Sequence, residues 1–194
     1  RRVHIEEEQR REVREVMAQA EAHYRRLGVP NFTVRGLTLM VGRQALEKFK
    51  VIQALGEVDR ILQAGKKVLL YAYRVQDGMW VANNGLEALA DMLEQRYGPG
   101  SVGRLFGGDN TVKSQRYRQQ VLERFQHGSL RILVGHPQMA GTGINADDIY
   151  GDAPREIVMI TPPYSALEMV QIAGRIARLT TRSQAVMNLL ITDT

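Results

Sequence analysis

The chain has 194 residues, 44% of them hydrophobic, which is enough for one α/β domain with a small appendage. It contains no cysteine, so disulfide bonds, thiolate catalysis and cysteine-ligated zinc are excluded. The net charge of +5 suits an anionic partner, and no apolar run approaches the roughly 20 residues that span a membrane. With no recognisable signal peptide, we expect an intracellular protein of the cytoplasm or nucleus, not a secreted one, with no membrane partner.

The N-terminal region is predicted to be an amphipathic helix over residues 5–27, which Gly28 and Pro30 end. Its apolar face is formed by Val13, Val16, Met17, Ala20, Tyr24 and Leu27. Residues 29–41 are expected to form a linker, at most with a short strand. The first twenty-six residues contain seven arginines and six glutamates, and this near-neutral charge argues against a nucleic-acid-binding arm. The apolar face is expected to pack on its own lobe, and the alternative is docking on another lobe or subunit.

Helices and strands alternate from residue 43 onward. The segments with helical spacing of apolar residues are 43–63, 86–97, 112–126 and 165–177. The short apolar runs typical of buried strands are 68–73, 102–106, 130–134, 157–160 and 186–192. Such alternation predicts an α/β fold with a parallel sheet flanked by helices, whose ligands bind at the carboxyl ends of the strands. We therefore divide the chain into residues 1–42, a helix and linker, and residues 43–194, the α/β domain.

Small residues follow the third predicted strand, first Gly135 and His136, and then the run from Ala140 to Asn145. Such residues let backbone amides approach an anion, although a plain turn is the alternative. His136 is placed to contact phosphate or act as a base, or it is an ordinary loop histidine. The acidic pair at residues 147–148 is predicted to be a solvated loop and not a metal site.

Two arginines near the C-terminus, Arg175 and Arg178, are three residues apart and are expected to share one face of the predicted helix. Their guanidinium groups are always charged and present a rigid fork of donors, which suits phosphate better than a protein core. Gly174 beside them lets another surface come close. A solvated basic helix face is the alternative. Ser165 and Glu168 form a predicted capping box that fixes the start of this helix.

The chain lacks the Gly-x-x-x-x-Gly-Lys-Ser/Thr pattern, so it has no phosphate-cradling loop of its own for ATP. It also lacks an Asp-Glu pair at a strand end to hold magnesium. Between Gly100 and Arg131 there are six basic residues and two acidic ones. This local surplus, with Lys113 and Arg116 in it, predicts contacts to a nucleic-acid backbone.

The order of these motifs resembles the C-terminal RecA-like lobe of superfamily 2 helicases and translocases, over about residues 43–194. The resemblance rests on the strand at 68–73, the Ala140–Asn145 run, and the final Gln171-x-x-Gly174-Arg175-x-x-Arg178 pattern. The last two motifs are most similar to those of Swi/Snf-type and related DNA-translocating ATPases. The expected fold is then a RecA-like parallel sheet flanked by helices, with an extra N-terminal amphipathic helix.

The resemblance also implies roles for particular residues. Arg178 matches the arginine finger nearest the γ-phosphate, and Arg175 matches its partner. Implied nucleotide contacts come from Gln171, Gly141, Gly143 and Asn145. Expected nucleic-acid contacts come from Thr142, Lys113, Arg116 and His136. ATP and Mg²⁺ would be held mainly by a separate P-loop lobe, and the polymer would be DNA, with RNA as the alternative. Two other interpretations are a non-catalytic RecA-like module that grips nucleic acid or protein, and a DEAD-box-like RNA helicase lobe.

Overall fold

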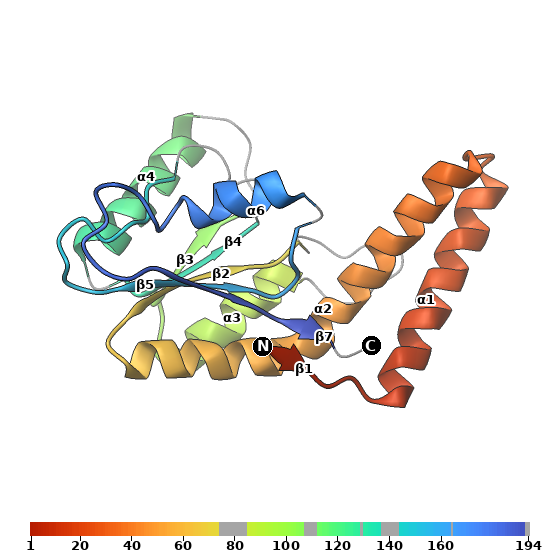
Figure 1. Cartoon of the computed structure of the whole chain (residues 1–194), viewed down its shortest axis with the longest axis horizontal. Coiled ribbons are helices and arrows are strands. Elements are labelled where there is room, and N and C mark those ends of the chain that lie inside the picture. The colour runs from red at the N-terminus through yellow and green to blue at the C-terminus, as the bar shows by residue number, and fades with distance from the viewer. Residues whose placement is uncertain (74–84, 107–111, 129, 137–143, 164, 193–194) are drawn as a thin grey trace.

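The computed structural model describes residues 1–73, 85–106, 112–128, 130–136, 144–163 and 165–192. At its centre is a five-stranded sheet with the strand order β3-β4-β2-β5-β6, in which every neighbouring pair is parallel (Figure 1). Its strands are β2 (Lys67–Tyr71), β3 (Val102–Leu105), β4 (Ile132–Gly135), β5 (Arg155–Met159) and β6 (Val186–Leu189). The predicted parallel sheet is confirmed, with strand ends that differ from the prediction by a few residues.

Helices cover both faces of the sheet, because the side chains of each strand alternate between the two faces. Val68 and Leu70 of β2 pack with the second half of α2 (Asn31–Gln63) and with α3 (Gly85–Tyr97). Leu69 and Tyr71 pack on the opposite face, with α4 (Val112–His127) and α6 (Ala166–Ala173) (Figure 1). Since the strands are parallel, their carboxyl ends meet along one side of the sheet, which we call the carboxyl edge.

The N-terminal region is a helical hairpin made of α1 (Glu7–Arg26) and the first half of α2, and it projects away from the sheet (Figure 1). Val13 of α1 packs in one cluster with Ala45 of α2. At the turn, the Val29 N–H donates to the Tyr24 carbonyl at 3.2 Å, and Gly28 has a φ of +71°. This is the bonding of a glycine-terminated helix, so the turn is tightly defined. The N-terminal helix therefore packs on α2 of its own chain, and the alternative of docking on another lobe or subunit stays a prediction.

The predicted linker over residues 29–41 is wrong, because α2 is one helix from Asn31 to Gln63. Gly36 and Gly42 lower the helix propensity of this stretch. A Cβ atom at Gly42 would lie 2.5 Å from the sulfur of Met17, so this glycine lets α1 approach α2 closely. Gly42 is therefore a packing contact between the two helices. The division of the chain after residue 42 stays a prediction, and α2 crosses it without a break.

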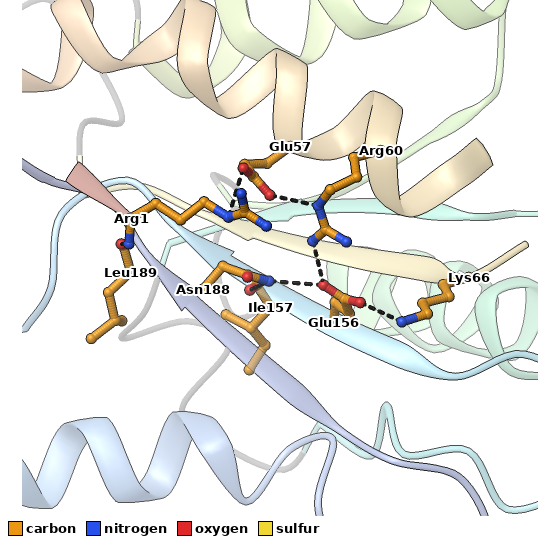
Figure 2. A network of polar contacts seen from close by, with 8 residues as sticks. All are labelled: Arg1, Glu57, Arg60, Lys66, Glu156, Ile157, Asn188 and Leu189. Carbon is orange, nitrogen blue, oxygen red and sulfur yellow. Dashed lines mark hydrogen bonds and ion pairs between the residues drawn. The ribbon is translucent and has the colours of Figure 1, made fainter. Parts of the chain in front are cut away.

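Charged side chains fix the second half of α2 to β5 and β6 (Figure 2). Arg60 and Lys66 each donate to one oxygen of Glu156 at 2.7 Å, and Asn188 donates to the same carboxylate at 2.9 Å. Glu156 is only 2% exposed. Burial alone would raise its pKa, but the hydrogen bonds from Arg60, Lys66 and Asn188 lower the pKa to about 2. This network lies near the start of β5, on the side of the sheet away from the carboxyl edge.

Two short strands at the ends of the chain pair with each other, and the sequence predicted neither of them as a separate strand. β1 (Arg2–Val3) pairs in parallel with β7 (Ile191–Thr192), so the predicted strand over residues 186–192 is divided into β6 and β7. The side chain of Arg1 extends the charged network, with its Nε 2.8 Å from Glu57 (Figure 2). The start of the chain is thereby held against α2 and the last strands.

Candidate functional site

Two segments that the sequence singled out separately, 144–148 and 175–182, are hydrogen-bonded to each other. The four bonds, donor first, run from Ala146 N to Arg175 O (3.0 Å), from Arg182 N to Asp148 O (2.8 Å), from Thr180 Oγ1 to Asp147 Oδ2 (2.7 Å) and from an Arg178 terminal nitrogen to Ile144 O (3.3 Å). Two of the four bonds have a backbone donor and two have a side-chain donor. The end of the glycine-containing run and the arginine segment therefore form one structural unit.

Arg178 is oriented by backbone carbonyls. Its Nε donates to the Gly174 carbonyl at 3.1 Å, and a terminal nitrogen donates to the Ile144 carbonyl at 3.3 Å. These bonds use two of the five N–H donors of the guanidinium. Since the residue is exposed, the remaining donors are available to an anion. The Arg178 side chain is thus held in place by one carbonyl just before its own segment and by one carbonyl of residues 144–148.

Arg175 has a different environment from Arg178. It is half-buried, and its Nε is buried without a hydrogen-bond partner among the described residues. The hydroxyl of Tyr71, at the end of β2, is also buried and without a partner in that part of the chain. Burial raises the pKa of Tyr71 well above its ordinary range, against the opposing effect of the nearby Arg175 charge. Arg175 is therefore near the end of β2, whereas Arg178 is bonded to the loop.

The predicted helix over residues 165–177 is too long, because α6 ends at Ala173. After Gly174 the chain continues in turns, in which the Arg175 N–H donates to the Ile172 carbonyl at 3.0 Å. Glycine is a weak helix former, which explains why the helix stops there. The two arginines consequently do not share a helix face. They are brought to one site by the turns and by their bonds to residues 144–146.

Glu168 joins α6 to the carboxyl edge. The Ser165 side chain accepts the Glu168 N–H at 3.5 Å, as predicted for the cap, but the Glu168 carboxylate accepts the Tyr73 hydroxyl at 3.0 Å. His136 meets the Tyr73 ring edge-on, with ring centroids 5.4 Å apart. Burial lowers the pKa of His136, so the neutral ring is favoured at neutral pH. This agrees with an ordinary loop histidine, and a contact from His136 to phosphate stays a prediction.

An open pocket lies between α2 and the carboxyl edge. It is lined by Met40, Arg43, Gln44, Glu47, Tyr73 and Thr161. The Tyr73 N–H donates to Glu47 at 2.9 Å, and the buried Thr161 hydroxyl has no partner among the described residues. No sequence pattern indicated this pocket, because its residues come from the predicted linker, a helix and two strand ends.

The helicase conserved C-terminal domain matches residues 47–180, which is more than half of the chain. The chain belongs to this family. With the observed sheet, the domain has the RecA-like fold of helicase C-terminal lobes, as the motifs suggested. A search of the curated proteins found no match.

Solved structures similar to this helicase C-terminal domain have the same fold. The C-terminal part of the Fun30 ATPase domain is 19% identical with a TM-score of 0.55, and the match covers 74% of this chain and 41% of that one. The E. coli DEAD-box protein SrmB bound to regulator of ribonuclease activity A is 15% identical with a TM-score of 0.51, and the match covers 75% of this chain and 72% of that one. Domain 2 of the DEAD-box helicase Mss116p bound to an RNA duplex is 18% identical with a TM-score of 0.50, and the match covers 78% of this chain and 51% of that one. The chain therefore spans about half or less of the Fun30 and Mss116p chains.

The acidic pair of this helicase C-terminal domain is buried, so the prediction of a solvated loop at residues 147–148 is wrong. Asp147 is 2% exposed and Asp148 is 0% exposed. Asp147 accepts the Thr180 hydroxyl, and Asp148 accepts the Gly151 N–H at 2.8 Å. Burial lowers the pKa of the fully buried Arg155 guanidinium, and the nearby charge of Asp148 opposes that shift. The Asp147 carboxylate and the Asp148 backbone carbonyl connect the loop to the arginine segment.

The basic surplus between residues 100 and 131 is partly used inside the domain. Arg104 contacts three carboxylates of α3, at 2.6–2.8 Å. Arg124 donates to the Gly100 carbonyl at 3.0 Å, and Arg131 donates to the Lys66 carbonyl at 2.9 Å. Arg116 is exposed on α4. The effective positive surface is therefore smaller than the sequence count suggests.

Several predicted site residues fall outside the described part of the structure, namely Gly141, Thr142, Gly143 and the side chain of Lys113. Gln171 and Asn145 are described, and both are exposed. Within the described residues, no group of three or more histidine, aspartate or glutamate side chains is arranged to hold a metal ion. In the same part of the chain, no helix combines the length and the hydropathy needed to cross a membrane.

Proposed function

We propose that this domain is the C-terminal motor lobe of an ATP-dependent nucleic-acid helicase or translocase. Its nucleotide site would be completed by a P-loop lobe, supplied by the same protein or by a partner. The observation that supports this most is the set of bonds between residues 144–148 and 175–182. They hold the arginine segment beside the loop that the motif pattern associates with both nucleotide and nucleic acid.

In this proposal Arg178 acts on charge that develops during phosphoryl transfer. An arginine presented across a cleft stabilises the transferring group, and such fingers increase turnover by several powers of ten. The two carbonyl contacts of Arg178 hold its guanidinium in place before nucleotide arrives. Arg175, whose buried Nε has no hydrogen-bond partner among the described residues, is the second donor. Gln171 and Asn145, both exposed, are the polar residues expected beside the nucleotide.

The residues present fit ATP better than they fit its metal ion. Arg178 is an exposed cation with donors to spare, which suits the terminal phosphate. Mg²⁺ in such sites is held by carboxylates and by the phosphates themselves. We therefore assign the Mg²⁺ ligands to the P-loop lobe. The role of this domain would be to complete the site and to contact the polymer.

We expect this chain alone to show no measurable ATP hydrolysis, because the phosphate-cradling loop is not in its sequence. The measurement is steady-state phosphate release with and without DNA or RNA. The control is the same assay on the complete protein, where turnover should be present and stimulated by the polymer. Turnover by the chain alone of about 1 s⁻¹ or more, the low end for ordinary enzymes, would contradict the two-lobe proposal.

We also expect a double charge reversal on α4, Lys113→Glu with Arg116→Glu, to weaken nucleic-acid binding in a salt-dependent way. Each phosphate contact releases counterions, so losing two should reduce the slope of log affinity against log salt by about 2. Binding of a labelled oligonucleotide to the complete protein at several salt concentrations measures this. The control is Arg11→Glu, which makes the same kind of charge reversal on α1 and should leave the salt slope unchanged. An unchanged salt slope would show that neither residue contacts the nucleic-acid backbone.

A further inference from the structure

The outer end of the helical hairpin exposes side chains that its own packing does not use. We define the hairpin tip as residues 22–36, which include the end of α1, the turn and the start of α2. Within it Phe32 is 90% exposed and Leu27 is 65% exposed. The bonds of the turn described above hold the tip in a defined shape. An aromatic ring presented this openly from a rigid turn is placed for contact with another molecule.

Charge is segregated along the hairpin, although its total is nearly neutral. Residues 6–21 contain six glutamates and three arginines, whereas residues 22–46 contain four arginines and no acidic residue. Arg25 pairs with Glu21 at 2.7 Å, at the boundary between the two stretches. No ion pair to Arg26 or Arg35 is present among the described residues. The tip is therefore positive and the base of α1 is negative, so the tip complements an anionic partner.

A glycine beside Phe32 indicates close approach by that partner. Gly36 is four residues after Phe32 and Arg35 is three residues after it, so all three are neighbours on one face of α2. Among the described residues, a Cβ atom at Gly36 would meet nothing within 4 Å, unlike one at Gly42, which would meet Met17. A helical glycine costs about 1 kcal/mol relative to alanine, and packing against the described residues does not require it at Gly36. The glycine leaves bare backbone next to an exposed ring and a cation.

We propose that the hairpin tip binds a single-stranded segment of nucleic acid, with Phe32 stacked on a base and Arg35 on a neighbouring phosphate. Base stacking on an aromatic ring combined with cationic contacts is the general chemistry of sequence-tolerant single-strand binding. This inference rests on the proposed function and adds a contact outside the α/β domain. From Glu47, which meets Tyr73 at the carboxyl edge, to Asn31 there are sixteen helical steps, or about 24 Å. The tip would thus contact the single strand well away from the candidate site formed by residues 144–148 and 175–182.

The test measures binding of the complete protein to a labelled single-stranded oligonucleotide over a range of salt concentrations. Arg35→Glu should weaken binding and reduce the salt slope by about 1, whereas Arg11→Glu, the same change near the base of α1, should leave both unchanged. Phe32→Ala should weaken binding by about fivefold to a hundredfold at every salt concentration, with the slope unchanged, because stacking releases no counterions. Equal behaviour of Arg35→Glu and Arg11→Glu, or wild-type affinity in Phe32→Ala, would overturn the proposal.

A second pair of variants separates binding from folding. Gly36→Ala and Gly56→Ala both place a methyl group in open space on α2, so both should raise thermal stability slightly. Only Gly36→Ala should weaken oligonucleotide binding, since only that methyl group would stand between the strand and the backbone. Equal oligonucleotide binding by the two variants would overturn the inference that the strand approaches the backbone at Gly36.

The outcomes also separate this proposal from its alternatives and from the proposed function. If Phe32→Ala leaves oligonucleotide binding intact but abolishes self-association or ATP turnover, the tip contacts protein and the proposal is wrong. If the tip variants bind normally while Arg178→Ala still abolishes turnover, the tip proposal fails and the motor proposal stands. A complete protein that binds no oligonucleotide would overturn both.

Discussion

Replacing Arg178 by alanine should reduce ATP turnover of the complete protein by at least about a hundredfold while changing ATP affinity little. A finger acts mainly on the transition state, so its loss lowers kcat and kcat/KM together and leaves ground-state binding nearly intact. A hundredfold loss is the cautious end for arginine fingers. Steady-state kinetics with an independent nucleotide-binding titration measures both quantities.

Two further variants make this result specific. Arg178→Lys keeps the charge but loses the two-carbonyl geometry at Gly174 and Ile144, so it should recover little of the turnover. Arg182→Ala is the matched control, because Arg182 is exposed in the same segment and its bond to Asp148 uses the backbone N–H. Thermal melting of all three variants excludes unfolding as the cause. Parallel losses in affinity and turnover, or full turnover in Arg178→Ala, would contradict the finger assignment.

The sheet could be predicted because its strands are buried on both faces and are therefore nearly continuous apolar runs. Two charged residues at the start of β5, Arg155 and Glu156, were missed for the same reason. They are 0% and 2% exposed, yet an apolar pattern cannot indicate them. Their burial depends on partners that are distant in the sequence, such as Arg60 for Glu156. Buried charge of this kind becomes visible only when the partners are placed in space.

The helical hairpin was only half predicted, because glycine has two opposite meanings in a helix. Gly42 lowers the helix propensity of the sequence, but in the fold it makes room for the sulfur of Met17. The charge count had a similar weakness. Summed over α1, arginine and glutamate cancel, and this sum hides the segregation that makes the tip basic. A total charge excludes a nucleic-acid contact only when the charges are evenly distributed.

The candidate site was predicted as motifs but not as geometry. Arg175 and Arg178 were expected on one face of a helix, and they instead follow the end of α6, with Arg175 in a turn. The contacts that bring them to residues 144–146 include two backbone carbonyls and one backbone N–H. Backbone contacts have no sequence signature. The motif therefore identifies which residues belong together, while the fold determines how they face one another.

Removing the charge of Glu156 should produce the largest loss of stability among the changes considered. The carboxylate is buried and accepts from Arg60, Lys66 and Asn188 (Figure 2). Its pKa falls from 4.5 to about 2 on folding, and at about 1.4 kcal/mol per pKa unit this corresponds to roughly 3 kcal/mol of stability. Breaking a buried ion pair costs a similar amount, about 3–5 kcal/mol. Because Arg60 also pairs with Glu57, we expect the lower end of that range.

The dependence on pH makes this prediction specific to the carboxylate. A group whose folded pKa is depressed stabilises the fold above its unfolded pKa, and that stabilisation is lost as the pH falls through the folded pKa. The difference in unfolding free energy between wild type and Glu156→Gln should therefore be constant near neutral pH and shrink between about pH 4.5 and 2. Urea titrations at a series of pH values measure it, with Glu123→Gln, an exposed site on α4, as control. A loss below about 0.5 kcal/mol, typical of surface substitutions, or a difference independent of pH would show that the network does not stabilise the fold.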